Sequence, residues 1–247
     1  MANIEIFGKR YETSLVIFDK DGTLLDFKQT WVNIIRELFA AIGRRTSMHD
    51  GLDRMLQKAL GVFTGEREID GNGPFAMGTS SEVNTILALC LYLEGMRWDR
   101  AQEIVRQAED EVFKGPVRER NLHVAQGALD LLKRLKARGI LTALATNDIK
   151  SDSTRDMEVT GALAYLDLVV GSDDVKQSKP APDMIHLICK RLTQNPMQTV
   201  MIGDTPMDAI MGRNAHVMLN IGVSGIVPQE VLASMNDVVI ASLDEIN

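Results

Sequence analysis

Three aspartates crowd directly behind an apolar run near the start of the chain. Asp19, Asp21 and Asp26 follow residues 15–18 (LVIF), whose pattern predicts a buried strand. Carboxylates this close raise one another's pKa. Asp-Gly at 21–22 is also a common turn signal. The stretch is therefore either a solvated turn or a site for a cation, and the rest of the chain has to decide.

Polar groups of matching chemistry follow three further predicted strands. They are Thr146, Asn147 and Asp148 after residues 140–145, Asp173, Asp174 and Lys179 after 166–170, and Asp204 with Asp208 after 199–202. Ligands of open parallel sheets bind beyond the carboxyl ends of the strands, so these four loops are expected to converge. Oxygen ligands without nearby His or Cys favour a hard cation such as Mg2+. A lysine, a hydroxyl and an amide can hold phosphate oxygens, so the loops favour phosphoryl transfer.

The elements that must position these residues alternate in the second half of the chain. Strands are predicted at 140–145, 166–170, 199–202, 217–221 and 238–240, and helices at 125–138, 153–160, 181–192, 206–213 and 228–235. This alternation predicts an α/β fold, a Rossmann-like parallel sheet with helices on both faces. The first ten residues predict a small hairpin turning at Gly8-Lys9.

Residues 28–118 break this rhythm, because their pattern is helical only. One helix is predicted at 31–42, ending at Gly43. A second begins at the capping box Thr79–Glu82, and a third spans 98–114. Residues 71–76 (GNGPFA) are interpreted as a loop, since no strand precedes them. The predicted organisation is an α/β core domain, 1–27 with 119–247, and an inserted all-helical cap domain, 28–118.

The composition is that of an ordinary globular protein. The 247 residues carry a net charge of −7 with 45% hydrophobic residues. A nucleic-acid partner is not expected, because the sequence shows no basic patch. Cys90 and Cys189 have no metal or redox spacing. The N-terminus lacks the pattern of a signal peptide, and the longest apolar run, 86–93, is too short for a membrane span. A cytoplasmic location without membrane partners is expected.

The motifs together carry a resemblance. DKDGT at 19–23, Thr146, Lys179 with Pro180, and GDTPMD at 203–208 resemble, in order and placement, the four motifs of the haloacid dehalogenase superfamily. The helical insert is similar to the cap of its phosphoglycolate phosphatase and β-phosphoglucomutase branch. One departure is Ser178, where family members often have Gly.

The resemblance implies roles for the acidic residues around one Mg2+ ion. Asp19 would be the nucleophile, forming an aspartyl-phosphate and ligating the metal. Asp21 would protonate the leaving group and then act as base on water, with its backbone carbonyl on the metal. A carboxyl beside a like charge favours the proton an acid catalyst needs. Asp204 would ligate the metal directly.

The resemblance also implies how the phosphoryl group is held. Thr146, Asn147 and Lys179 would bind it, and Asp208 would support the site by orienting Lys179 or through water. Structural alternatives stay open. Thr146-Asn147 suits a helix cap, Lys179 an exposed loop, and Asp208 a first-turn acid complementing a helix dipole. Asp173 or Asp174 could add a further acid.

The predicted function is a Mg2+-dependent phosphatase acting on a small phosphorylated metabolite, such as phosphoglycolate or a sugar phosphate. Asp21 favours phosphorus chemistry, because the dehalogenating members lack it. A phosphomutase is the alternative, and a catalytically idle binding protein on the same fold is a third. Candidate substrate contacts in the insert are Lys28, Arg44, Arg45 and Arg67. Both a monomer and a homodimer are compatible with the sequence.

Overall fold

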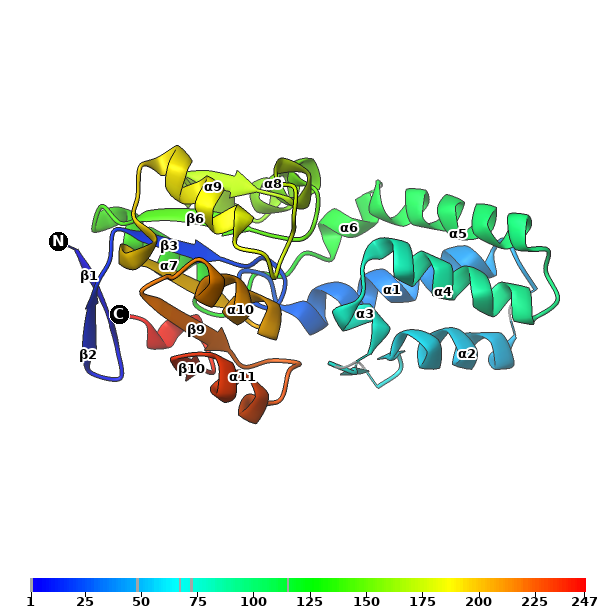
Figure 1. Cartoon of the computed structure of the whole chain (residues 1–247). Helices are drawn as coiled ribbons and strands as arrows, with labels where there is room; N and C mark the ends of the chain where they lie inside the picture. The colour runs from blue at the N-terminus through cyan, green and yellow to red at the C-terminus, as the bar shows by residue number, and fades with distance from the viewer. Residues whose placement is uncertain (1, 48, 67, 72, 115) are drawn as a thin grey trace. The chain divides into compact units, whose positions relative to one another are not determined.

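The computed structural model describes residues 2–47, 49–66, 68–71, 73–114 and 116–247 (Figure 1). The chain divides into two compact units. One, which we call the α/β unit, comprises the residues up to 27 together with 123–247. The other, the helical unit, comprises residues 28–122. This division ends the helical unit at residue 122, where the predicted cap domain ended at 118, and α6 (Pro116–Arg120) packs against α5 (Trp98–Phe113) just before it.

The α/β unit is built on six parallel strands in the order β10-β9-β8-β3-β6-β7. They are β3 (Leu15–Phe18), β6 (Leu141–Ala145), β7 (Leu168–Val170), β8 (Thr199–Gly203), β9 (Leu219–Val223) and β10 (Val238–Ile240). All residues of β3 and β8 are buried, as expected for central strands covered on both faces. The predicted Rossmann-like α/β class is confirmed.

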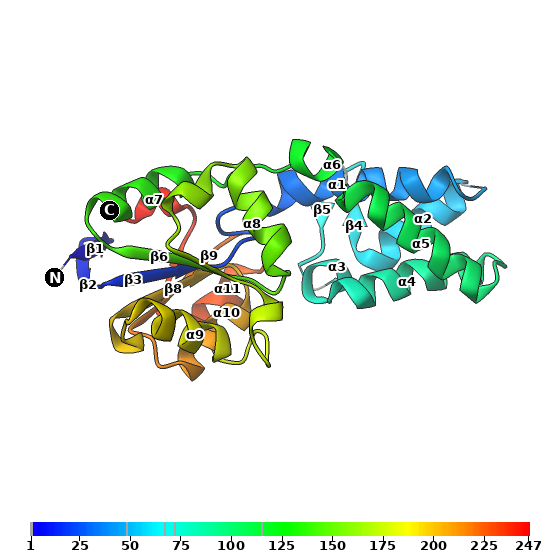
Figure 2. The same ribbon diagram turned by 90° about the horizontal axis from the view of Figure 1, so that it is seen from above.

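Helices cover both faces of this sheet. They are α7 (Ala128–Ala137), α8 (Lys150–Val159), α9 (Asp183–Leu192), α10 (Pro206–Asn214) and α11 (Gln229–Met235). Figure 2 shows α7 and α8 on one face and α9 and α10 on the other. Apolar side chains of α9 and α10, among them Met184, Ile188 and Met211, pack on Ile17 and Met201 of the central strands. Single 3-10 turns lie at 162–165, 172–174, 196–198 and 243–245.

Two predicted boundaries in this unit shift. The strand expected at 217–221 lies at 219–223, because the Val217 N–H donates to Gly212 O and closes the end of α10. The N-terminal hairpin, β1 (Asn3–Ile6) and β2 (Lys9–Glu12), turns one residue earlier than expected. Phe7 and Gly8 both have positive φ there, which suits a two-residue hairpin turn.

The helical unit consists mainly of helices, as predicted. They are α1 (Phe27–Gly43), α2 (Asp50–Leu60), α3 (Pro74–Met77), α4 (Ser80–Leu93), α5 and α6. Thr79 and Glu82 form the predicted capping box of α4. Three features depart from the prediction: α2 was not expected, α3 occupies part of the expected loop, and β4 (Val62–Phe63) pairs with β5 (Glu68–Ile69).

Across the described residues, no helix combines the length and the apolar character that crossing a bilayer requires.

Candidate active site

The strand order fixes where the site can lie. From the central β3 the chain continues through β6 and β7 on one side of the sheet, and then crosses to β8, β9 and β10 on the other. Such a reversal leaves a crevice at the carboxyl ends of the two strands that flank it. Asp19 directly follows β3 and Asp204 directly follows β8. The Asp19 N–H donates to Ile202 O at 2.8 Å, which holds the two strand ends together.

A tight turn carries the chain away from Asp19. The N–H groups of Leu24 and Leu25 both donate to Lys20 O, and the Gly22 N–H donates to Leu25 O. Gly22 has a φ of +82°, and a Cβ there would lie 2.0 Å from Asp204 Oδ2. Glycine is thus needed for its backbone angle and for the close approach of the Asp204 carboxylate.

Three carboxylates meet at this edge of the sheet. Asp19, Asp204 and Asp208 are buried, and each has an oxygen within 4.8 Å of the others. The Lys179 ammonium contacts Asp19 Oδ1 and lies 2.7 Å from Asp208 Oδ1. With only 5% of its side chain exposed, Lys179 is not a loop lysine in solvent. The structure therefore brings together four of the predicted site residues.

Asp208 serves two partners at once. Its Oδ1 accepts from Lys179, while its Oδ2 accepts from the Thr205 N–H at 3.1 Å and the Thr205 hydroxyl at 2.6 Å. These latter bonds form a capping box at the start of α10. A Cβ on Gly203 would lie 2.3 Å from the Asp208 carboxyl carbon, so Gly203 makes room for it. The orienting contact and the helix-terminal role thus coexist.

Burial dominates the electrostatics of this cluster. It raises the pKa of Asp19 to about 7, with Asp208 and Asp21 adding to the rise and Lys179 opposing it. Burial, then the charges of Asp19 and Asp208, likewise raise the pKa of Asp204 well above its usual range. For Lys179 burial alone would lower the pKa, but the two carboxylates it contacts raise it above the usual value. Lys179 offers one positive charge to three carboxyl groups, so ionisation of all three would leave an excess of negative charge.

This excess of negative charge fits a divalent cation. The donor set is oxygen only, which suits Mg2+. Asp204 Oδ1 is buried and has no hydrogen-bond partner among the described residues, which is costly for a carboxylate unless a cation accompanies it. Asp19 and Asp204 both belong to this cluster, and their role as metal ligands stays a prediction. The Asp21 carboxylate is not part of this group of three, and it lies 3.2 Å from Lys20 Nζ.

Thr146 and Asn147 belong to the loop after β6, which contacts the loop that carries Lys179. Thr146 is buried, and its Oγ1 accepts from the Asp148 N–H at 3.2 Å. Asn147 Oδ1 accepts from the backbone N–H of Lys179 at 3.1 Å, so the side chain tethers the lysine loop. Neither residue caps α8, whose N-cap is Ile149. The helix-cap alternative is therefore wrong, and phosphate binding by this pair stays a prediction.

Asp173 and Asp174 have structural partners. Asp173 Oδ1 accepts from the Lys150 N–H at 2.8 Å, at the start of α8. Asp174 Oδ2 accepts from the Gly171 N–H at 3.2 Å. Both carboxylates thus hold the loop after β7, and these contacts give no support to a further acid in the site.

Lys20 was not among the predicted site residues. It is fully buried, and its Nζ lies 2.6 Å from Asp148 Oδ2 and 2.9 Å from Asp156 Oδ2, in addition to Asp21. The one signal for it was a lysine between two aspartates directly after a buried strand. Asp156, on α8, gave none.

The candidate substrate contacts of the helical unit pair with acidic neighbours. Lys28 lies 2.9 Å from Glu68, and Arg44 and Arg45 both contact Glu111. Arg67 lies outside the described residues. Each described candidate already has a counter-ion, so these contacts do not single out a substrate-binding residue.

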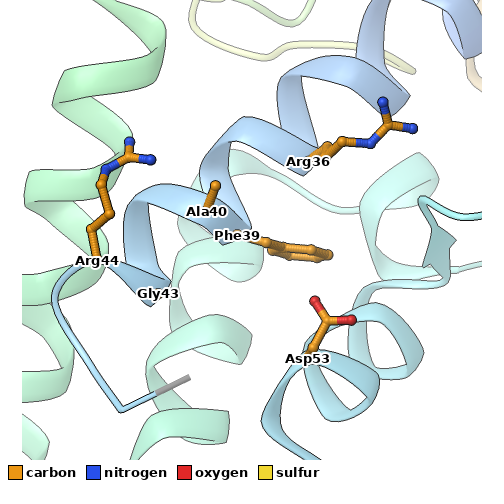
Figure 3. A pocket seen from close by; sticks show the side chains of 6 residues that line it. All are labelled: Arg36, Phe39, Ala40, Gly43, Arg44 and Asp53. Carbon is orange, nitrogen blue, oxygen red and sulfur yellow. The ribbon is translucent and has the colours of Figure 1, made fainter. Parts of the chain in front are cut away.

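A groove of about 480 Å³ lies within the helical unit (Figure 3). Its lining comprises Arg36, Phe39, Ala40, Gly43, Arg44 and Asp53. The Arg36 and Arg44 guanidinium groups point away from Asp53, and both donate elsewhere, to Thr64 O and Glu111. The groove contains none of the predicted catalytic or metal-binding residues.

Comparison with known proteins agrees with this geometry. The model of the haloacid dehalogenase-like hydrolase family matches residues 13–216, a range that contains every residue of the carboxylate cluster. The chain belongs to this family. The predicted resemblance is therefore confirmed, and so is an enzyme of the haloacid dehalogenase-like hydrolase type.

Relatives of this haloacid dehalogenase-like hydrolase include proteins named as phosphatases. It is 30% identical over 214 residues to the probable phosphatase IndB of Dickeya dadantii, covering 85% of this chain and 80% of that protein. It is 28% identical over 208 residues to a phosphoglycolate phosphatase of Psychrobacter arcticus, covering 83% and 81%. A candidate β-phosphoglucomutase from Thermotoga maritima superposes with a TM-score of 0.70 at 18% identity, covering 94% and 96%, which shows the common fold.

Proposed function

We propose that the chain is a Mg2+-dependent phosphatase that hydrolyses a small phosphorylated metabolite through an aspartyl-phosphate on Asp19. The observation that carries this proposal is the buried contact of Lys179 with Asp19 and Asp208, beside the unpartnered oxygen of Asp204. The phosphatase names of the relatives support the reaction class.

In the first step, an Asp19 carboxylate oxygen attacks phosphorus and forms a new P–O bond. The ester P–O bond breaks, and the leaving oxygen takes a proton from the Asp21 carboxyl. Lys179 faces the negative charge that the transferring phosphoryl group carries, as do Thr146 and Asn147 in the predicted binding pocket. A buried cation at this position stabilises the transition state more than a solvated one would.

In the second step, water attacks the phosphorus of the aspartyl-phosphate. Asp21, now a carboxylate, accepts the proton of the water, and the bond between phosphorus and the Asp19 oxygen breaks. Inorganic phosphate leaves, and both aspartates return to their starting protonation states. Asp21 thus donates a proton in the first step and accepts one in the second, as a single acid–base group must.

Asp19, Asp204 and the backbone carbonyl of Asp21 would hold the Mg2+ ion, with Asp208 supporting. When bound, the ion supplies positive charge that keeps the crowded carboxylates ionised and offsets the charge of the phosphoryl group. Asp208 keeps Lys179 directed at Asp19 through its 2.7 Å contact.

The test is phosphate release from a panel of phosphorylated metabolites, including phosphoglycolate and sugar phosphates, with Mg2+ and with EDTA. We expect activity with Mg2+ only, and a loss of at least about 10⁴-fold in kcat for Asp19→Asn. Mass spectrometry of rapidly quenched wild type should find a phosphoryl adduct on the peptide that contains Asp19. Asp130→Asn, an exposed aspartate of α7, is the matched control and should keep full activity.

Three outcomes would contradict the proposal. Equal activity of wild type and Asp19→Asn would exclude the aspartyl-phosphate. Failure of the wild type to bind Mg2+ and to release phosphate would support an idle binding protein instead. Isomerised sugar phosphate in place of free phosphate would indicate a phosphomutase. The cap role of the helical unit, a cytoplasmic location and the choice between monomer and homodimer stay predictions.

A further inference from the structure

Lys20 is the most completely buried charged side chain beside the candidate site, with 0% of it exposed. Its Nζ lies within 2.6–3.2 Å of oxygens from Asp21, Asp148 and Asp156. An ammonium group has three N–H donors. One donor is thus available for each carboxylate, and we refer to these four residues as the Lys20 cluster.

The three carboxylates of the Lys20 cluster come from separate segments of the α/β unit. Asp21 lies in the turn after β3, Asp148 follows β6, and Asp156 lies on α8. Residue 148 also adjoins Asn147, which accepts from the Lys179 N–H. The Lys20 cluster therefore fixes the turn that carries Asp21 against the same loop that tethers Lys179.

Stability alone does not account for this arrangement. Burying an ammonium group is costly, and apolar residues of similar volume often replace buried ion pairs without loss of stability. Within these four residues one ammonium faces three carboxylates, so Lys20 by itself does not neutralise them. Asp156 is only 2% exposed. A contact through Asp21 Oδ2 does, however, restrict the rotation of that carboxyl group, which is what an acid–base group needs.

We propose that Lys20 is a positioning residue that holds the Asp21 carboxyl in the orientation for proton transfer. This inference rests on the proposed function, in which Asp21 is the acid and then the base. Lys20 acts through Asp21 and does not contact the substrate. A lysine that only stabilises the fold would affect all substrates alike, whereas a positioning lysine affects those that need a proton.

The leaving group separates these two roles. Benzyl phosphate releases an alcohol that needs a proton, and dinitrophenyl phosphate releases a phenolate that does not. The ratio kcat/KM covers the steps up to the loss of the leaving group, so it reports proton donation without the later hydrolysis. The experiment compares both substrates, with Mg2+, for wild type, Lys20→Met, Asp21→Asn and the double variant of both positions.

We expect Lys20→Met to lower kcat/KM for benzyl phosphate about 10²-fold or more, in the range of lost general-acid catalysis. For dinitrophenyl phosphate the decrease should stay within about threefold, because no proton is required. Asp21→Asn should produce the same selectivity. Adding Lys20→Met to Asp21→Asn should cause no further selective loss, since both act through one group.

A second variant guards against a folding defect. Lys20→Met/Asp156→Asn removes one buried charge of each sign, and we expect a wild-type circular dichroism spectrum with the same substrate selectivity. Equal losses on both substrates, or an unfolded charge-matched variant, would assign the Lys20 cluster to folding and overturn the inference. A wild type inactive on both substrates would instead contradict the proposed function itself.

Discussion

The charged pairs at the candidate site and those on the surface of the helical unit lie in opposite environments. In the helical unit Arg97 pairs with Asp99, and Arg106 with Glu103, and each of these side chains is at least 38% exposed. In the α/β unit Lys20 and Lys179 are 0% and 5% exposed. Exposed pairs contribute little to stability, because water screens them. Buried charges interact strongly and cost much to desolvate.

The two kinds of pair also differ in balance. In the exposed pairs of Arg97 and Arg106, one guanidinium faces one or two carboxylates, and solvent already stabilises all of these charges. At the sheet edge, Lys179 faces Asp19 and Asp208 with Asp204 alongside. An uneven buried cluster destabilises the fold unless a ligand compensates it, which is the usual cost of a prepared active site. Burial, not the presence of a pair, therefore distinguishes the candidate site from the surface.

Among the changes that test this contrast, Lys179→Met has the largest expected effect. Removing the buried cation that faces the phosphoryl group should lower kcat/KM for a phosphomonoester about 10²–10³-fold, as for other preorganised groups. The measurement is steady-state phosphate release at saturating Mg2+. Lys133→Met, on the exposed surface of α7, is the control and should match wild type. A loss of less than about tenfold for Lys179→Met would remove it from the phosphoryl-binding role.

The second prediction concerns the metal-free protein. Burial raises the pKa of Asp19 to about 7 from 3.8, so between these values the folded state holds a proton that the unfolded state has lost. The free energy of unfolding should therefore fall as the pH rises through this window. The Asp19 contribution is about 2–4 kcal/mol, since one pKa unit corresponds to about 1.4 kcal/mol.

Urea unfolding in EDTA measures this effect, with Asp19→Asn as the reference that lacks the titrating group. Wild type should lose stability relative to Asp19→Asn from about pH 4 to about pH 7. Added Mg2+ should restore it at the upper end, because the ion binds the folded state. A difference between the two proteins that does not change with pH would contradict the raised pKa.

Asp208→Ala should have a smaller effect, divided between the two oxygens. Loss of the Oδ1 contact releases Lys179 and should lower kcat/KM about 10–100-fold, as for other orienting partners. Loss of the Oδ2 contacts leaves the Thr205 N–H without its cap and should cost about 1 kcal/mol of stability. Asp208→Asn, which keeps an acceptor oxygen, should recover part of both. Full activity of Asp208→Ala would show that Lys179 needs no support.

The sequence predicted the part of the site that follows strand ends. Asp19, Lys179 and Asp208 stand at fixed places relative to strands whose apolar pattern is plain, so topology alone brings them together. The contacts of Lys20 could not be predicted. Its partner Asp156 is 136 residues away, on a helix whose sequence gives no sign that this side chain is buried. Contacts of this kind depend on tertiary packing, which no local spacing encodes.

In the helical unit, one feature missed by the prediction could have been found from the sequence, and another could not. Leu52, Leu56 and Leu60 recur every four residues and are all buried on α2, so periodicity could have found this helix. The β4–β5 pair has two residues in each strand. Strands so short carry no period, and their pairing is set by the surrounding fold.

The smallest expected effect is that of Glu103→Gln, which removes one of the two acidic partners that Arg106 has among the described residues of α5. Solvent already stabilises both charges, so the unfolding midpoint and kcat/KM should equal those of wild type. The measurement is urea unfolding at low and high salt, beside Lys179→Met. If Glu103→Gln lowered stability as much as a change in the buried cluster, exposure would not be the property that separates the surface pairs from the candidate site. If it changed only the salt dependence, the surface pairs would contribute through long-range charge alone, and the contrast with the buried lysines would hold.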